Sequence, residues 1–240
     1  MWAYSCTTCR ITQANCGPEG SFINSETFLA TGKIMTTAPD RAPNSSVLPA
    51  ILNRWSPRAF QPEAISQEEL LSLIDAGRWA PSAYNIQPWR FIYARRGTAE
   101  WERFLSWLIP FNQSWAENAS AIIYVASQTI TLSNRTGEPS PLPTHAFDTG
   151  AAAVLIQVQA AHNGWATHPI SGFDHALAHA GLELPEEYEL HAAIILGRQG
   201  KLETLPQDLQ KREVPSGRNS LSTVSFEGRW NPSKETNMDE

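Results

Sequence analysis

Residues 148–163 constrain the fold more than any other stretch of this sequence. The segment reads DTGAAAVLIQVQAAHN and leaves almost no polar face at helical spacing. A helix that is apolar all round must be buried, and this one is too short to cross a membrane. The small residues from Gly150 to Ala153 permit another helix to approach closely. We therefore expect this helix at the centre of the domain or of a dimer, with Asn163 and Gly164 as its left-handed end.

A second distinctive stretch is the segment WAPSAYNIQPWRF, residues 79–91. Pro81 and Pro88 each fix a φ angle and bias the preceding residue away from helix, so the loop should be stiff. Asn85 and Gln87 carry planar amides that donate and accept hydrogen bonds together. Because this polar loop leads into an apolar strand, it indicates a binding site suited to the edge of a flat heteroaromatic ring.

The rest of the pattern alternates helices with short strands. Ser66 and Glu69 form a capping box for a helix over residues 66–80. Its predicted buried face comprises Leu70, Leu71, Leu73, Ile74 and Ala76. Further helices are predicted over 47–53, 98–108 (capped by Thr98) and 174–180, and strands over 89–94, 121–126 and 190–196. Residues 128–144 and 165–172 are predicted as loops, and 221–226 as a weak extended segment.

Composition sets the broad class of the protein. The 240 residues suit one or two domains at roughly 150 residues each. The net charge of -6 argues against nucleic-acid backbones and anionic membrane surfaces, which select for Lys and Arg. No apolar run approaches the roughly 18 residues of a membrane-spanning helix, and the N-terminus lacks the pattern of a secretory signal. We therefore expect a cytoplasmic protein with neither nucleic-acid nor membrane partners.

All three cysteines, Cys6, Cys9 and Cys16, lie in the first sixteen residues. Cys6 and Cys9 have the spacing of half a zinc site or of a redox motif, but no second pair accompanies them. The alternative is a disordered leader, and the polar, Pro-containing stretch after Met35 reads as a linker. The predicted organisation is a leader and linker over 1–45, a folded domain over 46–232 and a disordered tail over 233–240.

Arg54, Ser56 and Arg58 are the first candidates for chemistry. In an extended chain their side chains point to one side, where two guanidinium groups and a hydroxyl can surround a phosphate. The usual signatures of dinucleotide-binding, nucleoside triphosphate-binding and hydrolase sites are absent from the sequence. His175 and His179 have metal-ligand spacing but no obvious third ligand, so we predict no metal site. A cofactor must then bring the reactivity.

Several motifs, in this order along the chain, resemble those of the nitroreductase family of FMN-dependent oxidoreductases. The resemblance covers roughly residues 48–230. The motifs are R-x-S-x-R at 54–58, A-P-S-x-x-N-x-Q-P-W at 80–89, D-x-G-A at 148–151, P-x-x-G-F-D at 169–174 and a late basic segment around Arg218. Two positions depart from the family pattern: Ser171 stands where an acid is frequent, and Ser216 where a Lys is frequent.

The resemblance implies an α+β fold. Its central sheet would be mixed and mostly antiparallel, with helices on its flanks. Two copies of the chain would form a homodimer in which both chains line each site at the interface, and each chain would have an extended C-terminal arm. It also implies an FMN enzyme that uses NADH or NADPH to reduce nitroaromatic, quinone or similar small electron-poor acceptors by ping-pong hydride transfer. Alternatives on the same scaffold are dehalogenation, dehydrogenation, flavin fragmentation, or flavin binding without catalysis.

The same resemblance implies a set of FMN-contacting residues and no catalytic side chain. The phosphate and ribityl chain would be held by Arg54, Ser56, Arg58 and Arg218. The opposite subunit would contribute Ser82, Asn85 and Gln87. The isoalloxazine ring would lie against Pro169, Ile170, Ser171 and Gly172, with the backbone N–H groups of the last two near N5.

Overall fold

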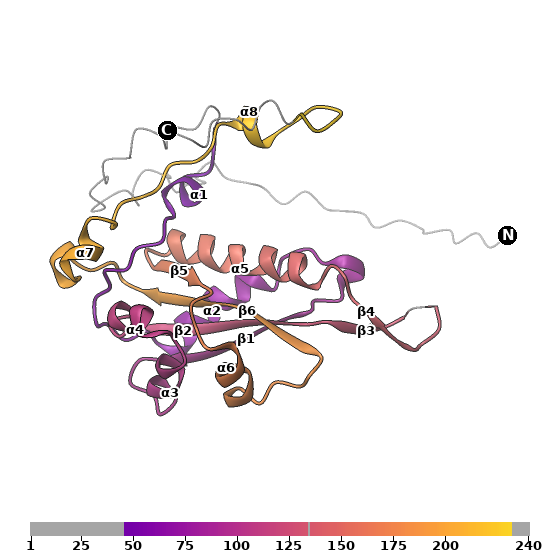
Figure 1. Ribbon diagram of the computed structural model, residues 1–240, viewed down its shortest axis with the longest axis horizontal. Helices are drawn as coiled ribbons and strands as arrows, with labels where there is room; N and C mark the ends of the chain where they lie inside the picture. The colour runs from indigo at the N-terminus through magenta and orange to yellow at the C-terminus, as the bar shows by residue number, and fades with distance from the viewer. Residues whose placement is uncertain (1–45, 134, 232–240) are drawn as a thin grey trace, which may run out of the picture. The chain divides into compact units, whose positions relative to one another are not determined.

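A four-stranded sheet lies at the centre of the chain in the computed structural model, which describes residues 46–133 and 135–231 (Figure 1). The predicted leader, its cysteines and the tail from residue 233 lie outside the described residues. The strand order is β1 (Trp89–Arg95), β2 (Ala121–Gln128), β6 (Tyr188–Gly197) and β5 (Ala166–Ile170). All three pairings are antiparallel, so the mixed character expected of the sheet is not found among the described strands.

Strand β2 shows why the sheet forms where it does. Its residues from Ala121 to Ser127 are all buried, which confirms the buried strand predicted over 121–126. Ile123 and Val125 point into one core cluster, whereas Ile122 and Tyr124 point into another. Because successive side chains of a strand point to opposite faces, a continuous apolar run is the pattern of a strand covered on both faces.

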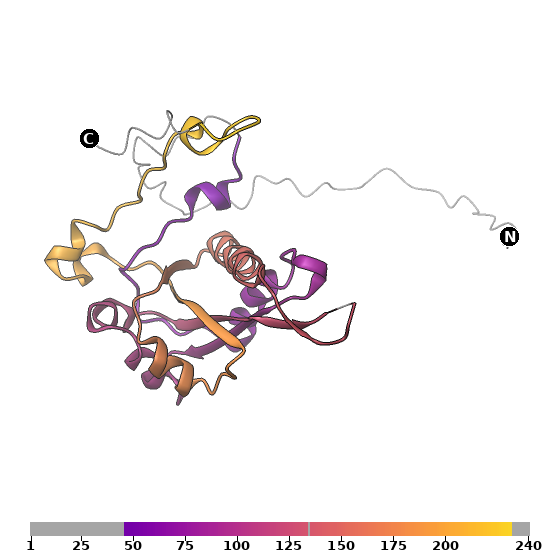
Figure 2. The ribbon, with the colours of Figure 1, turned by 45° about the vertical axis from the view of Figure 1, so that its right-hand side comes forward.

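Helices α2 (Gln67–Gly77) and α5 (His145–His162) cover one face of the sheet (Figure 2). The Ser66 half of the predicted capping box is confirmed, because its Oγ accepts from the backbone N–H of Glu69 at 3.0 Å. The Glu69 carboxylate accepts from Nε1 of Trp165 at 2.6 Å instead. A Cβ at Gly77 would lie 2.8 Å from Ile156, so glycine permits the two helices to approach closely. Leu71 was wrongly assigned to the buried face: it is 42% exposed.

The left-handed end of α5 is confirmed, because Gly164 has a φ of +76°. The expectation that α5 is buried on all sides is wrong for the chain alone. Ala152, Ile156 and Ala160 are fully buried, but Phe147 is 81% and Val154 is 52% exposed.

Helices α3 (Trp101–Ser106), α4 (Pro110–Ala116) and α6 (His175–Gly181) cover the other face. Phe104, Trp107 and Phe173 surround the ring of Tyr124, with ring centroids 5.2–5.5 Å from its own. The rings of Phe104 and Trp107 are 5.0 Å apart. Thr98 does not cap α3 as predicted, because its hydroxyl donates to the Arg95 carbonyl instead. Leu108 lies beyond the end of this helix, although it is buried.

Both predicted loops contain strands. Residues 128–144 hold a hairpin of β3 (Ile130–Leu132) and β4 (Pro139–Pro141), and β5 occupies most of 165–172. Both misassigned stretches contain prolines, which sheets tolerate on edge strands such as β5. The segment predicted as extended over 221–226 contains a helical turn, α8 (Leu221–Val224).

The remaining elements are short. They are α1 (Pro49–Asn53), η2 (Ala83–Asn85), η3 (Leu202–Thr204) and α7 (Gln207–Gln210). The helix predicted over 47–53 therefore begins two residues later, after Leu48. None of the helices in the described part of the chain is long and apolar enough to cross a membrane.

Candidate functional site

Arg54, Ser56, Arg58 and Arg218 line a single pocket of about 250 Å³. The structure thus brings together the first motif and the late basic segment, which are about 160 residues apart in the sequence. The complete lining is Arg54, Trp55, Ser56, Arg58, His168, Arg212, Val214, Ser216 and Arg218. We refer to this cavity as the arginine pocket.

The arginine pocket is strongly cationic. Burial and the neighbouring Arg212 lower the pKa of Arg58, whereas the carboxylate of Glu213 acts in the opposite direction. An arginine stays charged despite such a shift, because its ordinary pKa lies far above neutral pH. The Nε of Arg58 is buried and has no hydrogen-bond partner among the described residues. Guanidinium groups and a hydroxyl around one small cavity are a donor set suited to a phosphate.

His168, on β5, is a pocket residue that sequence reasoning missed. Its Nδ1 lies 3.0 Å from the Pro57 carbonyl, which can only accept, so this nitrogen carries the proton. Burial lowers the pKa of His168 to about 4, with smaller contributions from Arg58 and Arg54 in the same direction. The imidazole is therefore neutral at pH 7, and its Nε2 is an acceptor.

The second missed residue is Arg212, which follows Lys211 in a basic pair. That pair was the only available sequence signal, and it did not show that the segment folds back beside Arg58. No signal in the sequence pointed to His168, because its strand was predicted as a loop.

Residues 82–87 form a loop with unusual backbone angles. Tyr84, Asn85 and Gln87 all have positive φ angles, between 50° and 56°. The Oγ of Ser82 accepts from the backbone N–H of Gln87 at 3.0 Å. Non-glycine residues adopt this conformation only where their surroundings enforce it, and such positions cluster at functional sites. The ring of Tyr84 is 88% exposed, so the loop presents its polar and aromatic groups to solvent.

The third predicted group, Pro169 to Gly172, lies at the end of β5. The Gly172 carbonyl accepts from the backbone N–H of Ile109 at 3.1 Å and from the Asn112 side chain at 2.9 Å. A Cβ at Gly172 would meet Nδ2 of Asn112, so any larger residue here would displace the side chain that donates to the Gly172 carbonyl. These two hydrogen bonds fix the turn at Gly172, while Pro169 and Ser171 remain exposed.

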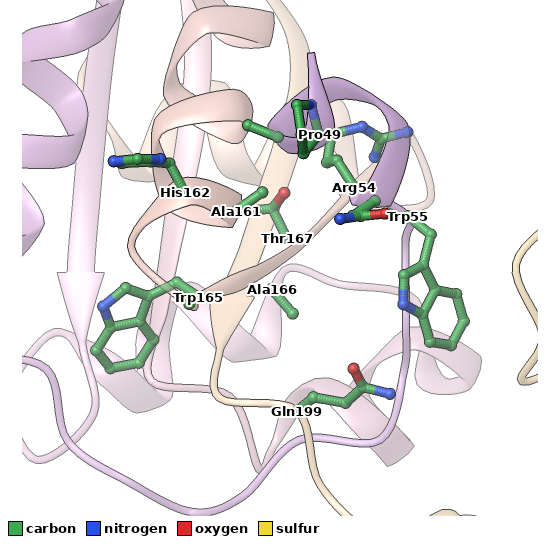
Figure 3. Close-up of a pocket in the computed structure, with 12 residues that line it drawn as sticks. Pro49, Arg54, Trp55, Ala161, His162, Trp165, Ala166, Thr167 and Gln199 are labelled. Atoms are coloured by element: carbon green, nitrogen blue, oxygen red, sulfur yellow. The ribbon is translucent and has the colours of Figure 1, made fainter. Parts of the chain in front are cut away.

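The predicted groups do not all meet within one chain. Arg54 also lines a neighbouring cavity of about 350 Å³ together with Ala161 and His162 of the last turn of α5 (Figure 3). The loop over 82–87 instead contacts the first turn of α5, where Asp148 accepts from the backbone N–H of Ala83. Since α5 has 18 residues, these two ends are about 27 Å apart.

A polar cluster around the buried Ser127 lies away from the arginine pocket. The hydroxyl of Ser127 is 2.7 Å from Nδ1 of His145 and 2.6 Å from Nε2 of His191. The carboxylate of Glu189 lies 3.8 Å from the other nitrogen of each ring. Ser127 is fully buried, so its hydroxyl cannot reach a substrate. The cluster therefore joins β2, β6 and the start of α5, and it escaped sequence reasoning because its members are far apart in the chain.

The two histidines of α6 do not face a common ligand. His175 stacks on Phe173 with a centroid distance of 4.1 Å, and Nε2 of His179 lies 3.2 Å from the Tyr188 carbonyl. Within residues 46–133 and 135–231, no group of three or more His, Cys, Asp or Glu side chains is arranged to hold a metal ion.

Comparison with known proteins identifies the family. The model of the nitroreductase family matches residues 51–198, more than half of the chain. A crystal structure described as an oxidoreductase containing FMN is 41% identical, with a TM-score of 0.78, and the match covers 82% of this chain and 99% of that one.

Two curated proteins are also similar over shorter stretches. The CLA biosynthesis enone reductase of Lactiplantibacillus plantarum is 32% identical over 96 residues, 40% of this chain and 44% of that protein. The putative NAD(P)H nitroreductase YdgI of Bacillus subtilis (strain 168) is 37% identical over 73 residues, 30% of this chain and 34% of that protein. The match thus spans less than half the length of either curated relative. The family model and the crystal structure carry the conclusion: this chain belongs to the nitroreductase family.

Proposed function

We propose that this protein is an FMN-dependent oxidoreductase that uses NADH or NADPH to reduce small electron-poor acceptors, such as nitroaromatics and quinones. The observation that carries the proposal is the convergence of Arg54, Arg58 and Arg218 on one pocket beside β5. The 41% identical oxidoreductase contains FMN according to its description, and YdgI is named as an NAD(P)H nitroreductase. Both descriptions support the proposal.

The arginine pocket fits the phosphate end of FMN. A volume of about 250 Å³ is below that of most pockets for whole drug-sized ligands, and it suits a phosphate and the adjoining polyol. Arg54, Ser56, Arg58 and Arg218 would hold these groups. The buried Nε of Arg58, which has no partner among the described residues, is a donor that the phosphate would satisfy.

The ring end of FMN would lie farther along the same strand. From His168 to Gly172 an extended chain advances about 13 Å, so the two groups can contact opposite ends of one ligand. The exposed Pro169 and Ser171, with the half-buried Ile170 between them, would lie along the isoalloxazine ring. Asn112 and Ile109 hold Gly172 rigidly and would keep the backbone N–H groups of this turn in a fixed position.

A homodimer would complete the site. The exposed side of α5 presents Phe147 and Val154, and an apolar stripe of this kind is stable when a second copy covers it. If two α5 helices pack antiparallel about a two-fold axis, the first turn of one lies beside the last turn of the other. Residues Ser82, Asn85 and Gln87 of one copy would then approach the arginine pocket of the other, which a single chain cannot achieve.

Bound FMN would supply the redox chemistry by accepting two electrons from NAD(P)H and passing them to the acceptor in a second half-reaction. The residues of this chain would bind the cofactor, orient it and leave one side of the site open for donor and acceptor in turn. We assign no side chain as a catalytic acid or base. A second candidate acceptor is an activated alkene, because the 32% identical relative is named as an enone reductase.

The test is spectroscopic and kinetic. The purified protein should show the visible absorbance of a flavin, and NADH or NADPH should bleach it under anaerobic conditions. Adding a nitroaromatic, a quinone or an enone should then restore the colour, and steady-state rates should rank the three classes. A protein that stays colourless after titration with FMN would overturn the proposal. A flavin that no nicotinamide reduces would instead favour a flavin-binding protein without turnover.

A further inference from the structure

We propose that Glu213 is a positioning residue that holds the two halves of the arginine pocket together. This inference rests on the proposed function, because it assigns Glu213 to the recognition of the FMN phosphate. Glu213 lies between two pocket residues of the C-terminal segment, Arg212 and Val214, but is itself not part of the lining.

The carboxylate of Glu213 contacts backbone rather than guanidinium groups. Its Oε1 accepts from the backbone N–H of Arg58 at 2.7 Å and from that of Ala59 at 2.8 Å. Glu213 is only 9% exposed, so both bonds are shielded from water. Hydrogen bonds to an ionised acceptor are about twice as strong as neutral ones. The backbone at Arg58 is therefore fixed by a residue 155 positions later in the chain.

The N-terminal half of the pocket is anchored on one side without Glu213. Ala59 accepts from the backbone N–H of Gly200 at 2.7 Å, and Gln61 donates to the Arg198 carbonyl at 2.9 Å. These bonds fix the residues that follow Arg58. Glu213 fixes Arg58 itself, at the point where the chain enters the pocket.

The C-terminal half of the pocket depends on the same carboxylate. The segment leaves the core at Leu209, which is 2% exposed, and reaches Arg218 through residues 213–217, which have no regular secondary structure. The Arg218 side chain hydrogen-bonds to Ser216 and Gly217 of its own segment. Glu213 thus links the segment that carries Arg212 and Arg218 to the loop that carries Arg54 and Arg58.

The two oxygens of Glu213 have different surroundings, which makes the inference testable. Oε2 is buried and has no partner among the described residues. Glu213→Gln keeps an oxygen that can accept both backbone N–H groups. Glu213→Ala removes the acceptor, and Glu213→Asp retracts it by one methylene. Glu203→Ala is the matched control, because it removes an exposed carboxylate from the same C-terminal region.

The experiment compares two flavins that differ only in the phosphate. FMN and riboflavin are each titrated into the flavin-free full-length variants, with flavin fluorescence as the readout. We expect Glu213→Ala and Glu213→Asp to weaken FMN at least tenfold and riboflavin less than threefold. Glu213→Gln and Glu203→Ala should keep FMN affinity within threefold of the wild type. A uniform loss for both flavins, or no loss of FMN affinity, would overturn the positioning role.

The outcomes also separate this inference from the proposed function. A wild-type protein that binds no FMN, or binds riboflavin equally well, would overturn both. A wild-type protein that prefers FMN, with Glu213 variants that keep this preference, would overturn only the role of Glu213. Should Glu213→Ala fail to fold, Glu213→Asp decides, because it retains the charge and most of the side-chain volume.

Discussion

The carboxylate of Asp148 accepts a hydrogen bond from the backbone N–H of Ala83 at 3.0 Å. Asp148 lies in the first turn of α5 and is 4% exposed, and it also accepts from the hydroxyl of Thr144 at 3.1 Å. The bond ties the positive-φ loop over 82–87 to the central helix. The acid of the D-x-G-A motif therefore has a structural role: it holds this loop in its positive-φ conformation.

Replacing Asp148 should release the loop. Asp148→Ala leaves the N–H of Ala83 without its acceptor, so we expect a loss of about 1–3 kcal/mol in the free energy of unfolding. Urea denaturation measures this loss, and hydrogen exchange should show faster exchange over residues 83–87. Asp75→Ala is the control, because Asp75 forms only an exposed ion pair with Arg78. Equal effects of the two substitutions would show that Asp148 does not hold the loop.

Removing one guanidinium from the arginine pocket should weaken FMN selectively. A charge-assisted hydrogen bond contributes about 1.5–3 kcal/mol, so Arg218→Ala should reduce FMN affinity roughly 10- to 100-fold. Riboflavin, which lacks the phosphate, should bind almost unchanged. Fluorescence titration at low and high salt measures both. Arg229→Ala, a change outside the lining of the pocket, should leave both affinities as they are. A matching loss of riboflavin affinity would contradict a role in phosphate binding.

A charge on the exposed side of α5 should separate the proposed dimer. Val154→Lys places an ammonium group at a position that is 52% exposed in the single chain and would be covered in the dimer. We expect the variant to elute as a monomer in size-exclusion chromatography with light scattering, and to lose its flavin. Leu177→Lys is the control, since Leu177 is 58% exposed on α6, on the other face of the sheet. A Val154→Lys dimer that retains flavin would contradict the antiparallel α5 arrangement.

Local sequence signals predicted the parts of the fold that depend on neighbouring residues. The Ser66 cap, the buried strand β2 and the glycine end of α5 follow from propensity and spacing, and all three are confirmed. Strand β5 was missed because Pro169 and Gly172 are turn signals. It is a strand only because the edge of β6 pairs with it, in a register that places Pro169 opposite Ile194.

The candidate site shows the same division. Arg54, Ser56 and Arg58 are close in sequence, and an extended chain was enough to predict that they meet. Their junction with Arg212 depends on how the C-terminal segment folds back, and their junction with His168 depends on the pairing of β5 with β6. No local pattern encodes either arrangement. The exposed apolar side of α5 likewise could not be distinguished from a fully buried helix, because sequence alone does not show whether the same chain or a second copy covers it.

The neutral His168 should make folding stability depend on pH. Its pKa is about 4 in the folded chain, against about 6.5 when unfolded. Between these values the unfolded chain binds more protons, so the free energy of unfolding falls as the pH is lowered. The stabilisation is fully present above pH 6.5 and is lost as the pH falls to 4. At about 1.4 kcal/mol for each pH unit, it amounts to about 3 kcal/mol.

Urea denaturation at pH 7 and pH 4.5 tests this dependence, because a comparison with His168→Gln removes the contribution of the carboxylates. The wild type should lose about 2–3 kcal/mol more between the two pH values than His168→Gln does. His162→Gln, at an exposed position on the last turn of α5, should behave as the wild type. A His168→Gln variant with the same pH dependence as the wild type would show that the imidazole is already accessible to protons in the folded chain. In that case burial would not keep the imidazole neutral at the edge of the arginine pocket.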